Sequence, residues 1–312
     1  MEERYVEVSV PATIETTEAL ADFLFSEGAL GLVIEDPLDT SPEVLIRASF
    51  SKTSAIEPII AQLEQYQGEL KTLGLTGAVG RIETRQIPAE DWGKSWKEHF
   101  KPLAVGRRLV VAPPWEAGPV PEDRFLIRID PGMSFGTGHH ATTRMCLEAL
   151  ETFMGQWAET QGPGILDVGA GTGILAIAAA ALGAERVLAI DTDPEACEAA
   201  ARNLALNSIT GRVQIFHGCV EALGSETRFD LALANLDAKG LCRLFEPVLN
   251  RLSPRGGLVV SGILVEEEGA VTAAARASGF RLAARQSEGE WLCLNLIPDG
   301  SESCWMEKRN AA

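Results

Sequence analysis

The first third of the chain alternates between strand-like and helical spacing of its apolar residues. Strand-like runs cover residues 5–10, 31–35, 44–50 and 79–86, and helical spacing covers residues 16–26 and 56–70. The order strand, helix, strand, strand, helix, strand predicts a small ferredoxin-like α+β domain over residues 1–87. It carries no nucleophile, metal-ligand cluster or phosphate loop. We therefore expect a recognition module, with a purely structural role as the alternative.

An amphipathic segment follows at residues 88–101. Trp92, Trp96 and Phe100 recur there at helical spacing. We expect a linker helix whose aromatic side chains pack in a core or between domains, rather than a ligand platform.

The pattern changes again at Pro163, where strands begin to alternate with helices. The strand-like runs are residues 165–168, 186–190, 213–217, 230–234, 257–261, 280–285 and 291–297. Helical spacing covers residues 173–182, 194–206, 238–252 and 266–278. Strands that alternate with helices of this length predict an α/β domain with a mostly parallel, seven-stranded, Rossmann-like sheet, and the last two runs predict an antiparallel edge. We assign residues 102–300 to this domain and residues 301–312 to a tail.

Composition narrows the class of protein. The 312 residues include 27 Lys and Arg against 44 Asp and Glu, for a net charge of -17. Such a surface disfavours nucleic-acid binding and attracts a basic protein partner. Neither a signal peptide nor a membrane span is predicted, and the six scattered cysteines fit free thiols in a reducing cytoplasm rather than disulfides or a metal site.

A glycine-rich turn lies between the first strand and first helix of the α/β domain. Gly169, Gly171 and Gly173 end the strand and precede an apolar helix. Glycines at this position let a ligand approach the backbone, at the edge where α/β folds bind nucleotides. Ile174 occupies the sixth position of the turn, where dinucleotide enzymes have a third glycine, so a nicotinamide dehydrogenase is disfavoured.

Asp191 ends the next strand, where a carboxylate can accept hydrogen bonds from both ribose hydroxyls of an adenosine. The alternative role is that of the N-cap of the helix after Pro194. The glycine turn and this acid together resemble class I S-adenosylmethionine-dependent methyltransferases.

Asn235 ends a further strand, in the sequence Ala-Asn-Leu-Asp. In amine and amide methyltransferases an Asn at this position sits beside the transferring methyl group, and its side chain can accept a hydrogen bond from the target amine. Alternatively, Asn235 is an ordinary helix cap before Ala238.

The stretch IDPGMSFGTGHHATT, residues 129–143, is the most specific part of the sequence. It resembles the Asp-Pro-Gly-x-x-Phe-Gly-Thr-Gly-x-His-x-Thr-Thr signature of the methyltransferases of ribosomal protein L-eleven (L11). The similarity extends over about 300 residues, through EDWGKSWKEHFKPLAVG, LDVGAGTGILAIAAAALGA and GGLVVSGIL to the amino-terminal YVEVSV. Two departures stand out: Ala141 replaces the family's usual proline, and Asp237 places a carboxylate beside the expected amine pocket.

The resemblance implies a set of site residues. Those expected to bind S-adenosylmethionine are Thr143, Gly169, Asp191 and Asn235, with Phe135 covering the cofactor and Gly171 and Gly173 shaping the loop. Asn235 and His140 are the expected catalytic residues, although His140 could instead only hydrogen-bond to backbone. Solvent, His139, His140 and Asp237 are the candidates for taking the proton of the amine.

The resemblance implies a cytoplasmic methyltransferase that transfers methyl groups to lysine side chains and the amino-terminal amine of ribosomal protein L11. Direct transfer to nitrogen needs neither a metal nor a covalent enzyme intermediate. The expected partner is this basic protein, without nucleic acid or membrane, and the default oligomeric state is a monomer. The alternatives are methyl transfer to another protein amine or a small-molecule amine, and a cofactor-binding protein without catalysis.

Overall fold

The structure is a computed structural model that describes most of the chain. The described residues are 4–35, 43–51, 54–72, 81–88, 101–116, 118–130, 138, 140–157, 162–209, 211–224 and 226–301. The chain divides into two compact units, at residues 1–100 and 101–312. The predicted linker helix with its three aromatic residues and the tail beyond residue 301 lie outside the described residues.

The first unit is an antiparallel sheet with two helices. Its strands are β1 (Arg4–Thr13), β2 (Gly31–Glu35), β3 (Glu43–Ser51) and β4 (Glu83–Pro88), and its helices are α1 (Thr17–Ser26) and α2 (Ile56–Thr72). The strand order is β2-β3-β1-β4, and every pairing is antiparallel. The elements follow the predicted order. Residues 79 and 80 of the last predicted strand lie outside the described residues, and β4 begins at Glu83.

The core of this unit comes from one face of the sheet and the facing sides of the helices. Val8, Val10, Ile46 and Phe50 are fully buried against residues such as Leu63 of α2. Their alternation along β1 and β3 is the pattern that predicted a half-buried sheet.

The second unit contains a seven-stranded sheet of order β10-β9-β8-β11-β12-β14-β13. The strands are β8 (Gly164–Val168), β9 (Arg186–Asp191), β10 (Val213–His217), β11 (Phe229–Asn235), β12 (Leu252–Leu264), β13 (Phe280–Glu288) and β14 (Trp291–Pro298). The first five strands in this spatial order are parallel, and β14 and β13 add an antiparallel edge. The predicted antiparallel ending is therefore present.

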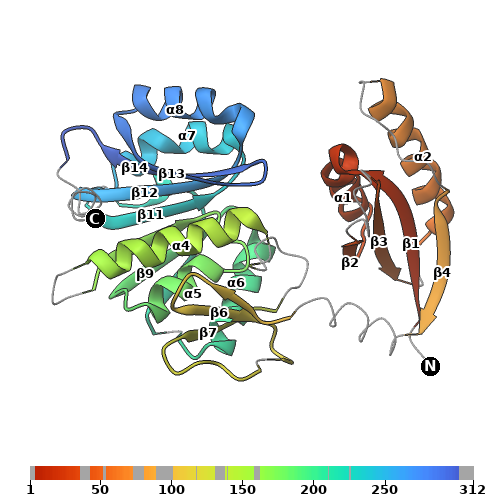
Figure 1. Ribbon diagram of the computed structural model, residues 1–312, viewed down its shortest axis with the longest axis horizontal. Helices are drawn as coiled ribbons and strands as arrows, with labels where there is room; N and C mark the ends of the chain where they lie inside the picture. Colours follow the sequence, from red (N-terminus) through yellow and green to blue (C-terminus); the bar gives the residue numbers. More distant parts are fainter. Residues whose placement is uncertain are drawn as a thin grey trace. The chain divides into compact units, whose positions relative to one another are not determined.

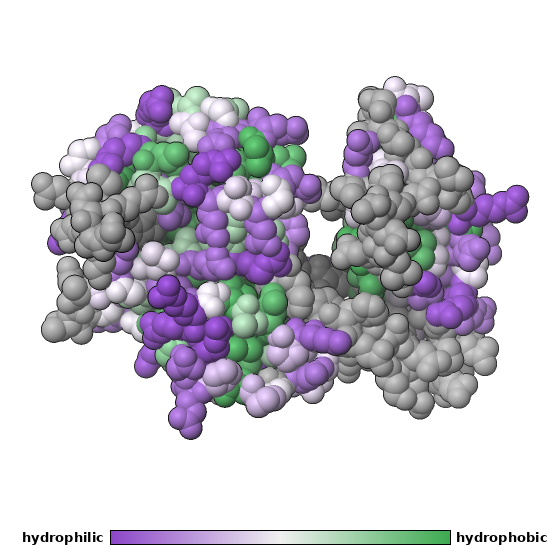
Figure 2. All heavy atoms as spheres, viewed as in Figure 1, coloured by the Kyte–Doolittle hydropathy of each residue, from purple (hydrophilic) through white to green (hydrophobic). Residues whose placement is uncertain are grey.

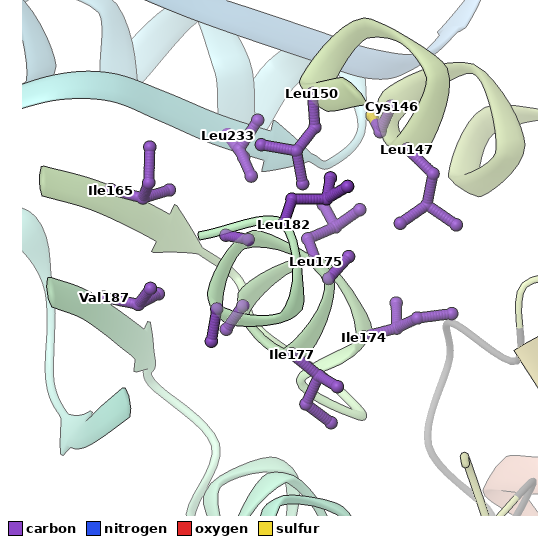
Figure 3. Packing of buried hydrophobic residues seen from close by; sticks show 14 of the residues in the cluster. Cys146, Leu147, Leu150, Ile165, Ile174, Leu175, Ile177, Leu182, Val187 and Leu233 are labelled. Carbon is purple, nitrogen blue, oxygen red and sulfur yellow. The ribbon is translucent and has the colours of Figure 1, made fainter. Parts of the chain in front are cut away.

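Helices cover both faces of this sheet (Figure 1). Helices α4 (Ala141–Gln156), α5 (Ile174–Ala181) and α6 (Pro194–Leu206) lie on one face, and α7 (Ala238–Leu249) and α8 (Glu268–Ala277) lie on the other. Figure 3 shows Leu150 of α4, Leu175 of α5 and Leu233 of β11 gathered in the core of the first face. Because helices cover both faces, the central strands β8 and β11 are almost continuously buried and mostly apolar.

A small sheet precedes α4 and was not predicted. Strands β5 (Leu103–Val105), β6 (Leu109–Ala112) and β7 (Phe125–Arg128) form it, with β6 in the middle. Runs of three or four residues are too short for a periodic signal. The predicted helix at residues 238–252 was also too long, because α7 ends at Leu249 and Leu252 already pairs with Phe229 in the sheet.

On the face seen in Figure 2, the described residues are mostly polar, with smaller apolar areas between them. The described helices include none that is long and apolar enough to cross a membrane. Within the described part of the chain, the five cysteines are free thiols, and no group of three or more His, Cys, Asp or Glu residues is arranged to hold a metal ion.

Candidate active site

The glycine turn connects β8 to α5 at the carboxyl edge of the sheet. Gly169, Gly171 and Gly173 all have positive φ angles, of 71°, 53° and 77°. Glycine is favoured there because other residues are strained in the left-handed region. Gly173 also packs closely on α6, since a Cβ added to it would lie 3.1 Å from the Cβ of Ala200.

Asp191 ends β9 and holds this turn in place. Its Oδ2 accepts a hydrogen bond from the backbone N–H of Gly171 at 2.9 Å, and its Oδ1 accepts one from Asp193 at 3.0 Å. An ionised carboxylate has about four acceptor positions, so both oxygens retain capacity for a ligand. The alternative role of Asp191 as N-cap is wrong, because the N-cap of α6 is Asp193. Its Oδ1 accepts a hydrogen bond from the backbone N–H of Glu195 at 2.8 Å.

A second carboxylate lies beneath the turn and was not singled out from the sequence. Asp167 of β8 is 1% exposed, and its Oδ2 accepts a hydrogen bond from the N–H of Ala176 in the first turn of α5. Its Oδ1 is buried without a hydrogen-bond partner among the described residues. Burial, with a smaller contribution from the charge of Asp191, raises the pKa of Asp167 to about 7.

The Asn235 side chain lies at the end of β11 against the start of α4. Its Nδ2 donates to Oγ1 of Thr142 at 3.2 Å and to Oγ1 of Thr143 at 3.3 Å. Its Oδ1 is buried and has no partner among the described residues. The alternative role of Asn235 as helix cap is wrong, because Asp237 caps α7 by accepting a hydrogen bond from Gly240 at 2.7 Å.

His140 is the N-cap of α4. Its Nδ1 lies 2.7 Å from Oγ1 of Thr142. The same nitrogen accepts a hydrogen bond from the backbone N–H of Thr142 at 3.4 Å. Its ring stands edge-on to Trp291 of β14, with 4.9 Å between ring centroids. Burial and then the charge of Arg144 lower the pKa of His140, while Glu288 acts in the opposite direction. The hydrogen bond to backbone that was the alternative role of His140 is present, together with a hydrogen bond to a side chain.

These residues form two groups at one edge of the sheet. The glycine turn and Asp191 make the first group, and Asn235 with the start of α4 makes the second. Leu236 joins them, because a Cβ added to Gly169 would lie 2.5 Å from its Cδ2. The strand order reverses between β8 and β11, and a crevice at such a reversal is where open α/β sheets bind ligands. Phe135 and His139 lie outside the described residues.

Asn203 and Asn207 were missed in the sequence and tie this edge together. Asn203 donates to the carbonyl of Thr172 at 2.9 Å and accepts the N–H of Asp130 at 2.9 Å. Asn207 pairs with both backbone groups of Arg128, at 2.8 and 2.7 Å. A signal was available for Asn203, because an Asn on the buried side of a helix needs hydrogen-bond partners. A further missed residue of the site is Thr142, in the first turn of α4.

The groups at this edge suit a ligand with hydroxyl and amino groups, such as a nucleoside. The glycine turn lets a ligand approach the backbone, and the Asp191 carboxylate can accept hydrogen bonds from hydroxyl groups. The buried Oδ1 atoms of Asp167 and Asn235 have no hydrogen-bond partner among the described residues. Together with the doubly wound, parallel-rich sheet, this site defines a class I methyltransferase-like protein.

Comparison with known proteins specifies the family. The model of the family described as ribosomal protein L11 methyltransferase (PrmA) matches residues 4–297. Curated relatives of that name from Pelobacter propionicus and Trichlorobacter lovleyi are 37% and 39% identical, over 94% and 93% of this chain and 97% and 96% of theirs. The crystal structure of ribosomal protein L11 methylase from Lactobacillus delbrueckii subsp. bulgaricus aligns with a TM-score of 0.58 and 32% identity, covering 64% of this chain and 99% of that one. The chain belongs to the ribosomal protein L11 methyltransferase family.

Proposed function

We propose that the protein uses S-adenosylmethionine to methylate amines of ribosomal protein L11: lysine side chains and the amino-terminal amine. The observation that carries this proposal is the unpartnered, buried Oδ1 of Asn235 beside a glycine turn braced by Asp191. The family's curated relatives are named ribosomal protein L11 methyltransferases. We propose that the enzyme acts in the cytoplasm, as a ribosomal substrate suggests, and that it acts as a monomer without nucleic-acid or membrane partners.

The cofactor would be held by the residues that the two groups bring together. Asp191 would accept hydrogen bonds from ribose hydroxyls, and Gly169, Gly171 and Gly173 would let the cofactor approach the backbone. Thr143 and Asn235 would contact it from the start of α4 and the end of β11, and Phe135 would cover it. When bound, S-adenosylmethionine supplies a methyl group already activated on a positively charged sulfur.

The work left to the protein concerns the acceptor amine, because an ammonium group has no lone pair. A lysine with a pKa near 10.4 loses its proton at pH 7 at a cost of about 4–5 kcal/mol, and an α-amine at only about 1 kcal/mol. Asn235 Oδ1 can accept a hydrogen bond from the neutral amine and so direct the lone pair of the amine towards the methyl group. Burial lowers the pKa of such an amine, which reduces the cost, and positioning supplies further acceleration.

We propose that residues 1–87 form a ferredoxin-like domain that recognises the protein substrate. The strand order β2-β3-β1-β4 with two helices supports this assignment. We further propose residues 88–101 as the linker, residues 102–300 as the catalytic domain and residues 301–312 as the tail. The net charge of -17 would favour encounter with a basic ribosomal protein.

The sequence feature that favoured a different amine has another explanation. Asp237 is exposed and caps α7, so its carboxylate has a structural role. Nothing else in the described residues favours a small-molecule amine over a protein.

The test is mass spectrometry of purified L11 after incubation with the enzyme and S-adenosylmethionine. We expect mass gains in steps of one methyl group, which peptide mapping assigns to lysines or to the amino terminus. L11 whose amines have been chemically acetylated beforehand is the control and should gain no mass from the enzyme, because an amide nitrogen is not a nucleophile. Cofactor binding in calorimetry without any transfer to untreated L11 would overturn the proposed substrate and support a non-catalytic protein or another acceptor.

A further inference from the structure

A chain of hydrogen bonds runs from His140 through Thr142 to Asn235. Nδ1 of His140 lies 2.7 Å from Oγ1 of Thr142, and Nδ2 of Asn235 lies 3.2 Å from the same oxygen. Thr142 is 1% exposed, so bulk water does not compete for its hydroxyl. The chain ends at the amide whose other polar atom, Oδ1, has no partner among the described residues.

The direction of each hydrogen bond follows from the backbone. Nδ1 of His140 accepts the N–H of Thr142, so this nitrogen carries no proton and the ring is the Nε2–H tautomer. The Thr142 hydroxyl must then be the donor in the 2.7 Å contact with Nδ1. Its lone pairs are left to accept from Asn235, whose Nδ2 has a second hydrogen for Thr143.

We propose that His140 and Thr142 are positioning residues that fix the orientation of the Asn235 amide, with its oxygen turned to the acceptor amine. The proposal rests on the proposed function, because the amine is what the oxygen would receive. If the amide were rotated by 180°, Nδ2 would take the place of Oδ1. Its N–H groups would then face the N–H groups of the amine, and no hydrogen bond could form. His140 thus acts through Thr142 and Asn235, and it does not take the proton of the amine.

The charge state of His140 controls this chain. Inside the protein it faces Arg144 of α4 and Glu288 of β13, and burial is the largest influence holding its pKa below the ordinary value. Once protonated, Nδ1 would donate to Thr142, and the hydroxyl hydrogen would have to turn towards the N–H groups of Asn235. Reversal of the amide relieves that conflict. At a pH below the pKa of His140, the Asn235 amide should therefore rotate, and Oδ1 should no longer face the acceptor amine.

The first test compares substitutions at Thr142 in the full-length enzyme. Thr142→Val removes the hydroxyl at nearly constant shape, and we expect kcat for L11 to fall about tenfold or more, because a misoriented reacting group loses rate steeply. Thr142→Ser should recover kcat to within about threefold, the allowance for one lost methyl contact. Thr152→Val, on an exposed turn of the same helix, is the control and should leave kcat unchanged.

A second measurement does not depend on turnover. In ¹⁵N NMR of the labelled full-length protein, we expect the His140 ring to be the Nε2–H tautomer at pH 7.5 in both wild type and Thr142→Val, because both keep the backbone N–H that donates to Nδ1. If wild-type protein does not methylate L11 but shows this pattern, the proposed function fails and the hydrogen-bond chain stands. The Nδ1–H tautomer in wild type, or equal kcat in Thr142→Val and wild type, would overturn the positioning role.

The pH dependence provides a third readout. Below the pKa of His140, log kcat of wild type should rise more steeply with pH than that of His140→Asn. The Asn side chain keeps an acceptor at the helix cap but does not titrate. Parallel profiles for the two enzymes would contradict control by the imidazole.

Discussion

The backbone N–H of Gly171 donates to the carboxylate of Asp191 at 2.9 Å, which joins the glycine turn after β8 to the end of β9. The acid proposed to bind the ribose therefore also holds the turn that would approach the cofactor. Loss of this side chain would remove a ligand contact and loosen the turn together.

We therefore expect Asp191→Ala to weaken S-adenosylmethionine binding by about tenfold or more, because a charge-assisted contact is lost. Asp191→Asn keeps an oxygen for Gly171 and should fall between wild type and the alanine variant. Isothermal calorimetry measures both. Asp193→Ala removes the neighbouring acid that caps α6 and should lower stability with little change in affinity. Equal affinity in wild type and Asp191→Ala would contradict the ribose role.

A second prediction concerns Gly262 in β12, beside the Asn235 amide. Its φ is +84°, and an added Cβ would lie 3.1 Å from Oδ1 of Asn235 and even closer to the backbone oxygen of Leu236. A backbone oxygen cannot move aside as a flexible side chain can. We expect Gly262→Ala to lose about 3 kcal/mol or more in the free energy of unfolding, through strain and overpacking together.

The matched control for that substitution is Gly289, in the turn between β13 and β14. Its φ is +59°, but nothing lies within 4 Å of an added Cβ. Gly289→Ala should therefore cost only the conformational term, about 1–2 kcal/mol. Urea denaturation of both variants compares the two costs. If Gly289→Ala is as damaging as Gly262→Ala, the crowding around Asn235 is not what requires glycine.

Much of the fold could be predicted from hydrophobic periodicity. The α6 boundaries agree at both ends, because Pro194 starts the helix and the polar face of its sequence is unambiguous. The three-stranded sheet of β5, β6 and β7 could not be predicted, since strands of three or four residues carry too little pattern. Helix α7 was overextended because Leu252 continues its apolar spacing but is held in β12 by its pairing with Phe229.

Candidate site residues could be predicted where a sequence motif contains them. They could not be predicted where a contact forms only when distant segments meet in the fold. Asp191 and Asn235 stand at strand ends, which the sequence pattern reveals. Thr142 became important only because β11 brings Asn235 within 3.2 Å of it, 93 residues further along the chain. Asp167 likewise gained its raised pKa from burial beneath α5, which no local pattern reports.

A third prediction follows from that buried carboxyl group. The folded pKa of Asp167 is about 7, above the value of 3.8 for an unperturbed Asp. Asp167 therefore contributes fully to the free energy of unfolding below pH 4, where it is protonated in both the folded and the unfolded protein. This contribution is lost as the pH rises to 7, by an amount of order 4 kcal/mol. Asp167→Asn does not titrate, so its stability relative to wild type should rise between pH 4 and pH 7 and level off above it.

Denaturation curves at a series of pH values measure this difference directly. The absolute stability of both proteins changes as other groups titrate, but those contributions cancel in the comparison. A wild-type minus variant difference that stays constant between pH 4 and pH 8 would show that Asp167 is ionised throughout in the folded protein.

The last prediction concerns Asp237, where this chain departs from its family. The side chain is exposed and accepts the N–H of Gly240 at 2.7 Å, as the N-cap of α7. Asp237→Leu restores the residue usual in the family but removes the cap, so the free energy of unfolding should fall by about 1 kcal/mol. Asp237→Ser retains a capping oxygen without the charge and should stay close to wild type.

Mass spectrometry of L11 should find the same methylated amines with all three enzymes, because the carboxylate is engaged with the helix. A changed set of methylated amines in both variants would instead assign the Asp237 charge to substrate choice.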